Sequence, residues 1–176
     1  FAAGGKHAPV VLFHDADHGS ALIDATARFG KGLPAHVIPV QVNEQSQIGP
    51  EIMAAALAYG AGGLRVLARE RPAHPLEGLQ DSLDLMAVIC TQTGHDPAAC
   101  GLLSIDDPDA LDRALWQPAT AARATRSGFL LQDDKRGLLL LAVEEMNRTA
   151  PTPTDFIALP QGAPLAPSRW ITLPAR

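Results

Sequence analysis

The chain has 176 residues, of which 47% are hydrophobic and 19% are charged, which is enough for one full-sized hydrophobic core. The net charge of −5 argues against a protein that binds the phosphate backbone of nucleic acids. Uncharged apolar runs such as Gly137 to Val143 are far shorter than the about 20 residues that a transmembrane helix needs. The sequence therefore predicts a single domain with no membrane span.

The two cysteines indicate a reduced, cytoplasmic setting. Cys90 and Cys100 fit no metal-ligand spacing such as a CxxC pair. Cys90 lies on the apolar side of a predicted helix, which is typical of a small buried hydrophobic residue. The chain begins at Phe1 with no initiator Met and no signal sequence, so we expect it to be a piece of a longer protein.

The first third of the chain alternates between strand and helix patterns. Residues 9–13 (PVVLF) predict a buried strand, and residues 21–29 predict a helix capped by Ser20 or Asp17. Residues 35–42 predict a second strand, in which Pro39 favours an edge position or a bulge. On the first helix the residues expected to face the core are Leu22, Ile23, Ala25, Thr26 and Phe29.

A strand–helix–strand crossover over residues 42–67 is the clearest pattern in the chain. Pro50 suits the first turn of its helix, and Gly60, Gly62 and Gly63 end that helix before a strand at 64–68. Apolar residues at three- and four-residue steps predict a single buried face. Its members are Ile48, Ile52, Ala55, Ala56 and Tyr59.

The next elements continue the alternation. Residues 75–93 predict a long amphipathic helix, 101–105 a fourth strand, and Asp106 or Asp107 with Pro108 the start of a helix through Ala114. In the long helix we expect these residues to be buried: Leu76, Leu79, Leu83, Met86 and Cys90. Four short strands alternating with helices predict an α/β fold. We expect a flavodoxin-like doubly wound sheet of four or more mostly parallel strands, with the first and third strands adjacent.

The C-terminal part has a different character. Residues 117–131 are hard to assign, 133–148 predict a helix, and 150–167 are rich in proline. Short strands at 156–159 and 169–173 are expected to pair as a hairpin. We therefore predict an α/β core at 1–116, a helical extension at 117–150, and an extended connector with a hairpin at 151–176 that leads to a module absent from this chain.

The first candidate site is the loop after the first strand, which contains His14, Asp15, Asp17 and His18. In a doubly wound sheet, the loops at the carboxyl ends of the strands line the ligand crevice. Three roles are open for these residues: binding a divalent metal ion, general acid or base chemistry, and a hydrogen-bonded loop that caps a helix.

Two further loops are expected at the same edge. The second strand is followed by Asn43, Glu44, Gln45, Ser46 and Gln47, where the alternatives are a solvated loop and a surface that docks a partner. Arg69 and Arg71 follow the third strand and could pair with Asp15 or Asp17. Neither GxGxxG nor GxxxxGK[ST] is present, so nucleotide binding is not expected, and Ser20 lacks a GxSxG motif.

The order FHDADHG, ARFGKGLPAHVIPV, VNEQSQIGPEIMAAALAYGAGGLRVL and LLSIDD resembles the domain family of the methyl-viologen-reducing hydrogenase delta subunit, over about residues 9–116. Cysteines of that family hold an iron–sulfur cluster. The matching positions here are His14 or Asp15, Asn43 or Glu44, and Arg69. Because none is a cysteine, the resemblance does not carry cluster binding to this chain.

The chain also looks like the interior domain of bacterial ferredoxin-type [4Fe-4S] proteins, in which FIALPQGAPLAPSRWITLPAR would lead into a CxxCxxC segment. The resemblance implies a non-catalytic scaffold or docking domain of an iron–sulfur electron-transfer protein. Its partners would be neighbouring ferredoxin modules of the same chain and a redox partner protein, with the [4Fe-4S] clusters elsewhere in the parent. The alternatives are a small metal- or ligand-binding enzyme that uses His14, Asp15 and His18, and a dimerisation module built on the alanine-rich helix.

Overall fold

The computed structural model describes residues 7–72, 74–117, 128–131, 134–160 and 170–173, and it is an α/β fold. Its elements in chain order are β1 (Val10–His14), α1 (His18–Phe29), β2 (Val37–Gln41), the 3-10 helix η1 (Gln45–Gln47), α2 (Pro50–Ala58), β3 (Gly63–Ala68), α3 (Glu77–Gln92), β4 (Cys100–Ser104), α4 (Pro108–Leu115), α5 (Lys135–Arg148), β5 (Phe156–Ala158) and β6 (Trp170–Thr172).

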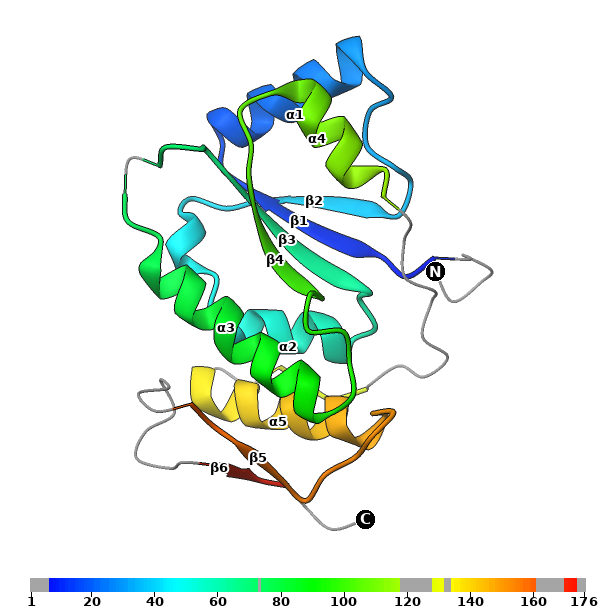
Figure 1. Cartoon of the computed structure of the whole chain (residues 1–176), viewed down its shortest axis with the longest axis vertical. Helices are drawn as coiled ribbons and strands as arrows, with labels where there is room; N and C mark the ends of the chain where they lie inside the picture. Colours follow the sequence, from blue (N-terminus) through cyan, green and yellow to red (C-terminus); the bar gives the residue numbers. More distant parts are fainter. Residues whose placement is uncertain (1–6, 73, 118–127, 132–133, 161–169, 174–176) are drawn as a thin grey trace.

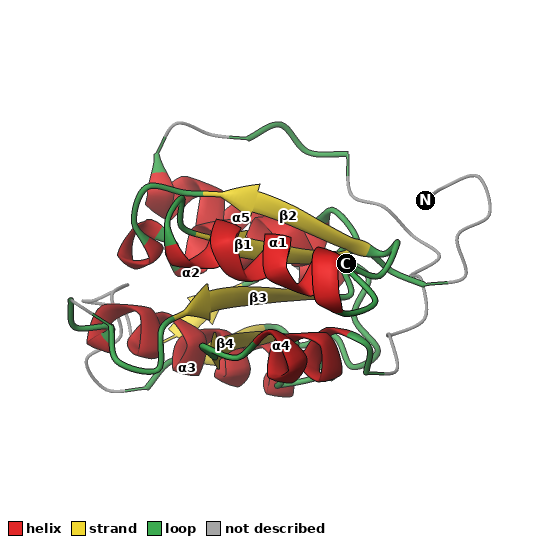
Figure 2. Ribbon diagram, turned by 90° about the horizontal axis from the view of Figure 1, so that it is seen from above, coloured by secondary structure: helices red, strands yellow, loops and turns green. Residues whose placement is uncertain are grey.

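The four N-terminal strands form one parallel sheet in the order β2-β1-β3-β4, as in a flavodoxin-like doubly wound fold. Helices α1 and α4 cover one face of the sheet, and α2 and α3 cover the other (Figure 1). The predicted fold class is therefore confirmed, including the adjacent first and third strands. The two edges of the sheet are β2 and β4 (Figure 2).

Pro39 occupies an edge strand, as the sequence predicted. Val10 N–H donates to His36 O at 2.8 Å, and Val42 N–H donates to His14 O at 2.9 Å. In a parallel pair, residues on one strand direct their N–H and C=O groups alternately to one side and the other. Even-numbered residues of β2 therefore face β1, and Pro39 places its missing N–H on the solvent side, where no ladder bond is lost.

Helix α2 lies in the interior of the protein, between the sheet and α5 (Figure 1). Of the helix pairs in the described chain, α2 and α5 make the most extensive contact. Met53 and Ala54 are fully buried and Leu57 nearly so, so the prediction of one buried face was wrong. The second face is covered by a helix far along the chain. An alanine-rich dimer surface would first have to displace α5.

The β5–β6 hairpin packs outside α5, and two side-chain amides fix its first strand. Asn147 on α5 exchanges two hydrogen bonds of 2.9 Å with the backbone of Thr154. Gln92 on α3 exchanges two of 2.8 Å with Ala158. Ile157 is completely buried. The hairpin prediction is confirmed, and the division into residues 1–116, 117–150 and 151–176 stays a prediction.

Several helix details differ from the prediction. Phe29 is 82% exposed, although the periodicity of α1 predicted that it faces the core. It is the last residue of α1, and periodicity alone does not show how far along a helix the core extends. Helix α1 starts three residues earlier than expected, at His18. Asp107 caps α4 as predicted, with bonds from the N–H groups of Asp109 and Ala110. Of the segment that the sequence left unassigned, residues 118–127 lie outside the described residues.

Candidate functional site

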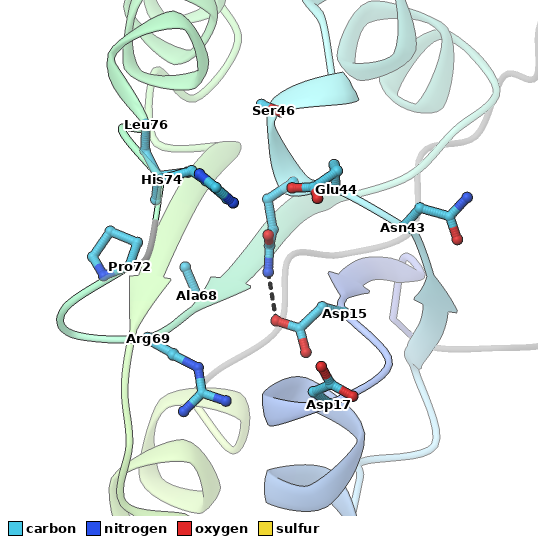
Figure 3. A pocket seen from close by; sticks show the side chains of 11 residues that line it. Asp15, Asp17, Asn43, Glu44, Ser46, Ala68, Arg69, Pro72, His74 and Leu76 are labelled. Atoms are coloured by element: carbon cyan, nitrogen blue, oxygen red, sulfur yellow. Dashed lines mark hydrogen bonds between the residues drawn. The ribbon is translucent and has the colours of Figure 1, made fainter.

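Loops at the carboxyl ends of β1, β2 and β3 surround a cavity of about 200 Å³ (Figure 3). It lies at the edge where doubly wound sheets bind their ligands. The residues that line it are Asp15, Asp17, Asn43, Glu44, Gln45, Ser46, Ala68, Arg69, Pro72, His74 and Leu76. Of the candidates chosen from sequence, the cavity therefore brings together Asp15, Asp17, Asn43, Glu44 and Arg69. His14, His18, Gln47 and Arg71 do not line it.

Asp15 caps α1 in place of the two residues expected to do so. Its Oδ1 accepts a hydrogen bond from Gly19 N–H at 3.0 Å, whereas the side chain of Asp17 makes no capping bond. Partial burial pushes the pKa of Asp15 up, but hydrogen bonds from Gly19, Gln45, His18 and Asp17 outweigh this and leave the pKa below its ordinary value. The carboxylate thus fills the helix N-terminus, where an anionic ligand would otherwise bind.

Gln45, one of the polar residues that the sequence placed in the loop after the second strand, joins the ends of three strands. Its Nε2 donates to Asp15 Oδ2 at 2.7 Å (Figure 3) and to Leu67 O at 3.4 Å. Gln45 itself lies in the loop after β2, Asp15 follows β1, and Leu67 is in β3. One amide group therefore holds the loops around the cavity in register with one another. The sequence selected Gln45 as part of this polar loop, but it did not predict the contacts with Asp15 and Leu67.

His14 is buried at the end of β1 and bonds within its own loop. Its Nδ1 lies 2.9 Å from Asp15 O and 3.4 Å from Ser20 Oγ, so this nitrogen donates to the carbonyl group. Gly19 packs against it so closely that a Cβ at Gly19 would lie 2.5 Å from His14 Cβ. Ser20 Oγ donates to Asp15 O at 3.2 Å. These contacts make His14 and Ser20 parts of the turn into α1.

His18 points to a different partner from His14. Its Nε2 lies 2.9 Å from Asp106 Oδ1, in the loop that leads to α4. The angle between the two groups does not allow a hydrogen bond, and His18 Nε2 has no hydrogen-bond partner among the described residues. The contact with Asp106 is therefore electrostatic, and it is an ion pair only when the imidazole is protonated. His14, Asp15 and His18 therefore do not converge on one point. No group of three or more His, Cys, Asp or Glu side chains in the described part of the chain could hold a metal ion.

Among the described residues, the charged side chains in and beside the cavity form no salt bridge with one another. Arg69 and Arg71 are exposed, and among the described residues neither forms a salt bridge with Asp15 or Asp17, which corrects the expected pairing. Asn43 and Glu44 are also exposed. The site thus consists of an inner frame of hydrogen-bonded side chains and an outer rim of exposed polar groups.

Comparisons with known proteins identify no family. No protein-family model matches the chain, and no curated protein matches its sequence. Within the described residues, no helix is long and apolar enough to cross a membrane.

Proposed function

We propose that this chain is a scaffold or docking domain of an iron–sulfur electron-transfer protein and that it holds no cluster itself. The motif order that resembles the hydrogenase delta-subunit family supports the redox context. One observation of the structure carries the proposal. At the exits of β1, β2 and β3, Asp15, Glu44 and Arg69 lie around one cavity, and none of the described residues that line this cavity carries a thiol.

The two cysteines do not fit a cluster either. Cys100 begins β4 and Cys90 lies in the last turn of α3, and both are buried. Burial, and then the neighbouring Cys90, raise the pKa of Cys100 to about 12. Iron–sulfur clusters are held by thiolates, and a thiol with such a pKa stays protonated near neutral pH.

The same edge is suited to docking a neighbouring module. The hydrogen bond that Gln45 Nε2 donates to Asp15 Oδ2 fixes the positions of two of the loops. The cavity also has exposed polar side chains, which are those of Asn43, Glu44 and Arg69. Glu44 is negatively charged and Arg69 is positively charged. A backbone that is already fixed loses little further conformational entropy when a partner binds. The partner would be a [4Fe-4S] module of the parent chain or its redox partner protein.

A binding measurement with charge-reversal variants tests the docking role. The cysteine-rich modules of the parent, supplied as a separate polypeptide, are titrated into this chain in a calorimeter. We expect binding that the double change Glu44→Lys and Arg69→Glu weakens at least about tenfold. Asp84→Lys, on the exposed side of α3, is the matched control and should leave the affinity unchanged. Absence of binding, or equal weakening by the control, would contradict the proposal.

A second candidate is a small ligand-binding protein or enzyme that uses His14, Asp15 and His18, although of these three residues only Asp15 lines the cavity. This role would require both histidines to leave the contacts described above. Metal analysis of the purified chain separates the candidates. Stoichiometric zinc that is lost on changing His14 and His18 to alanine would support the second candidate and oppose the scaffold.

A further inference from the structure

The charges around the cavity at the carboxyl ends of the strands are not balanced. Asp15, Asp17 and Glu44 line it, and among the described residues that line it only Arg69 carries a permanent positive charge. Burial raises the pKa of Asp15, but the hydrogen bonds to its carboxylate lower the pKa by more, so Asp15 stays ionised near neutral pH. The lining therefore has a net negative charge, which favours a cationic group.

Two of these carboxylates have no partner within the described part of the chain. Asp17 precedes α1 and Glu44 precedes η1, and neither side chain makes a capping bond. Neither of them forms another hydrogen bond or a salt bridge with a described residue. Both are exposed. Their charge is therefore available to a group that enters the cavity from outside.

The other side of the cavity contains apolar side chains. In Figure 3 the three carboxylates, from the loops after β1 and β2, lie on the right. Ala68 of β3, with Pro72 and Leu76 of the following loop, lies on the left, beside Arg69 and His74. Lysine and arginine bury their methylene stems along apolar surface while the charged head keeps polar partners. A side chain of this kind matches both sides of the cavity.

We propose that the cavity receives a lysine or arginine side chain of the protein that docks at this edge, an inference that rests on the docking role proposed above. The stem of that side chain lies along Ala68 and Leu76, and its charged head lies beside the carboxylates of Asp17 and Glu44. Arg69, on the opposite side, stays available to an acidic group of the same partner.

The size of the cavity favours a side chain over a free ligand. Its volume is about 200 Å³, whereas pockets that enclose a drug-sized ligand measure about 300–1,000 Å³. Within the described residues, no three or more acidic, His or Cys side chains are grouped so that they could hold a metal ion. A side chain that belongs to a docked protein needs little affinity of its own, because the rest of the interface keeps its local concentration high.

Neutralising the two unpartnered carboxylates tests the proposal. The double variant Asp17→Asn and Glu44→Gln keeps the shape of both side chains and removes their charges. We expect it to bind the cysteine-rich modules of the parent at least about tenfold more weakly in calorimetry, with a smaller loss of affinity on adding salt. Asp81→Asn with Asp84→Asn, on the exposed side of α3, removes the same charge outside the cavity and should leave the affinity unchanged. Modules that bind both double variants equally well would overturn the cavity assignment and leave the docking role intact.

A small probe separates the cavity assignment from the docking role. The blocked peptide acetyl-Gly-Lys-Gly-amide is titrated into the chain, and the side-chain amide signal of Gln45 is followed by NMR. We expect a shift that saturates in the millimolar range, and none with the norleucine peptide, which has the stem without the charge. An equal shift with norleucine, or in the Asp17→Asn and Glu44→Gln variant, would overturn the proposal. A lysine-specific shift without binding of the modules would support the cation site and contradict the docking role. Spermidine that binds more tightly than the modules would assign the cavity to a free polyamine and overturn the proposal.

Discussion

Replacing Met146 by alanine is expected to lower the free energy of unfolding by about 2–5 kcal/mol. Met146 is fully buried on α5 within the same cluster as Met53 and Leu57 of α2. Truncation leaves a cavity between two helices that are fixed from both sides, so the site has little room to collapse. Urea unfolding followed by circular dichroism measures the change.

Arg136→Ala is the matched control on the same helix. Its side chain is exposed, and the change should alter stability by less than about 0.5 kcal/mol. A single transition that moves to lower urea with an unchanged slope would show that α5 unfolds together with the sheet. If Met146→Ala costs less than about 1 kcal/mol, α5 is not part of the common core.

Replacing Gln45 by alanine is expected to cost about 1.5–3 kcal/mol, the range for a hydrogen bond to a charged group. The lost amide donates at 2.7 Å to Asp15, whose carboxylate also caps α1. Gln47→Ala, two residues along the same loop, is the matched control because Gln47 is exposed and does not line the cavity. Equal stability of the two variants would show that the Asp15–Gln45 contact does not hold the loops.

The effect of Gln45→Ala should depend on pH in a defined direction. The pKa of Asp15 is lowered in the folded protein, so its ionised form contributes stability above the unfolded pKa of about 3.9. That contribution is lost as the pH falls through the lower folded pKa. The stability gap between wild type and Gln45→Ala should therefore narrow below about pH 4, as measured by urea unfolding across that range.

Local patterns predicted the sheet well because the residues that start or stop each strand and helix lie within or next to that element. The β-branched run at the first strand, Pro50 at a helix start, and Asp107 with Pro108 all act within a few residues. Pro39 indicated an edge strand because a proline cannot donate to a ladder bond. Strict alternation of short strands and helices then left one economical topology.

The rest could not be predicted because it depends on partners far apart in the sequence. The second buried face of α2 exists because α5 covers it, and α5 begins only at Lys135. Gln45 matters because it meets Asp15 and Leu67, 30 and 22 residues away. Periodicity and propensity carry no information about such contacts. The residue that caps α1 was predicted wrongly for a local reason. Asp15 accepts the hydrogen bond of Gly19 N–H across a turn that the sequence pattern did not indicate.

The central claim is that this chain holds no iron–sulfur cluster, and its iron and sulfide content after anaerobic reconstitution tests this claim most directly. The purified chain and, as positive control, a cysteine-rich [4Fe-4S] module of the proposed parent are treated side by side with ferrous iron and sulfide, then desalted. We predict that the module becomes brown, while this chain stays colourless with far less than one cluster per molecule. Stoichiometric iron and sulfide in the chain itself, with the broad visible absorption of a cluster, would contradict the account.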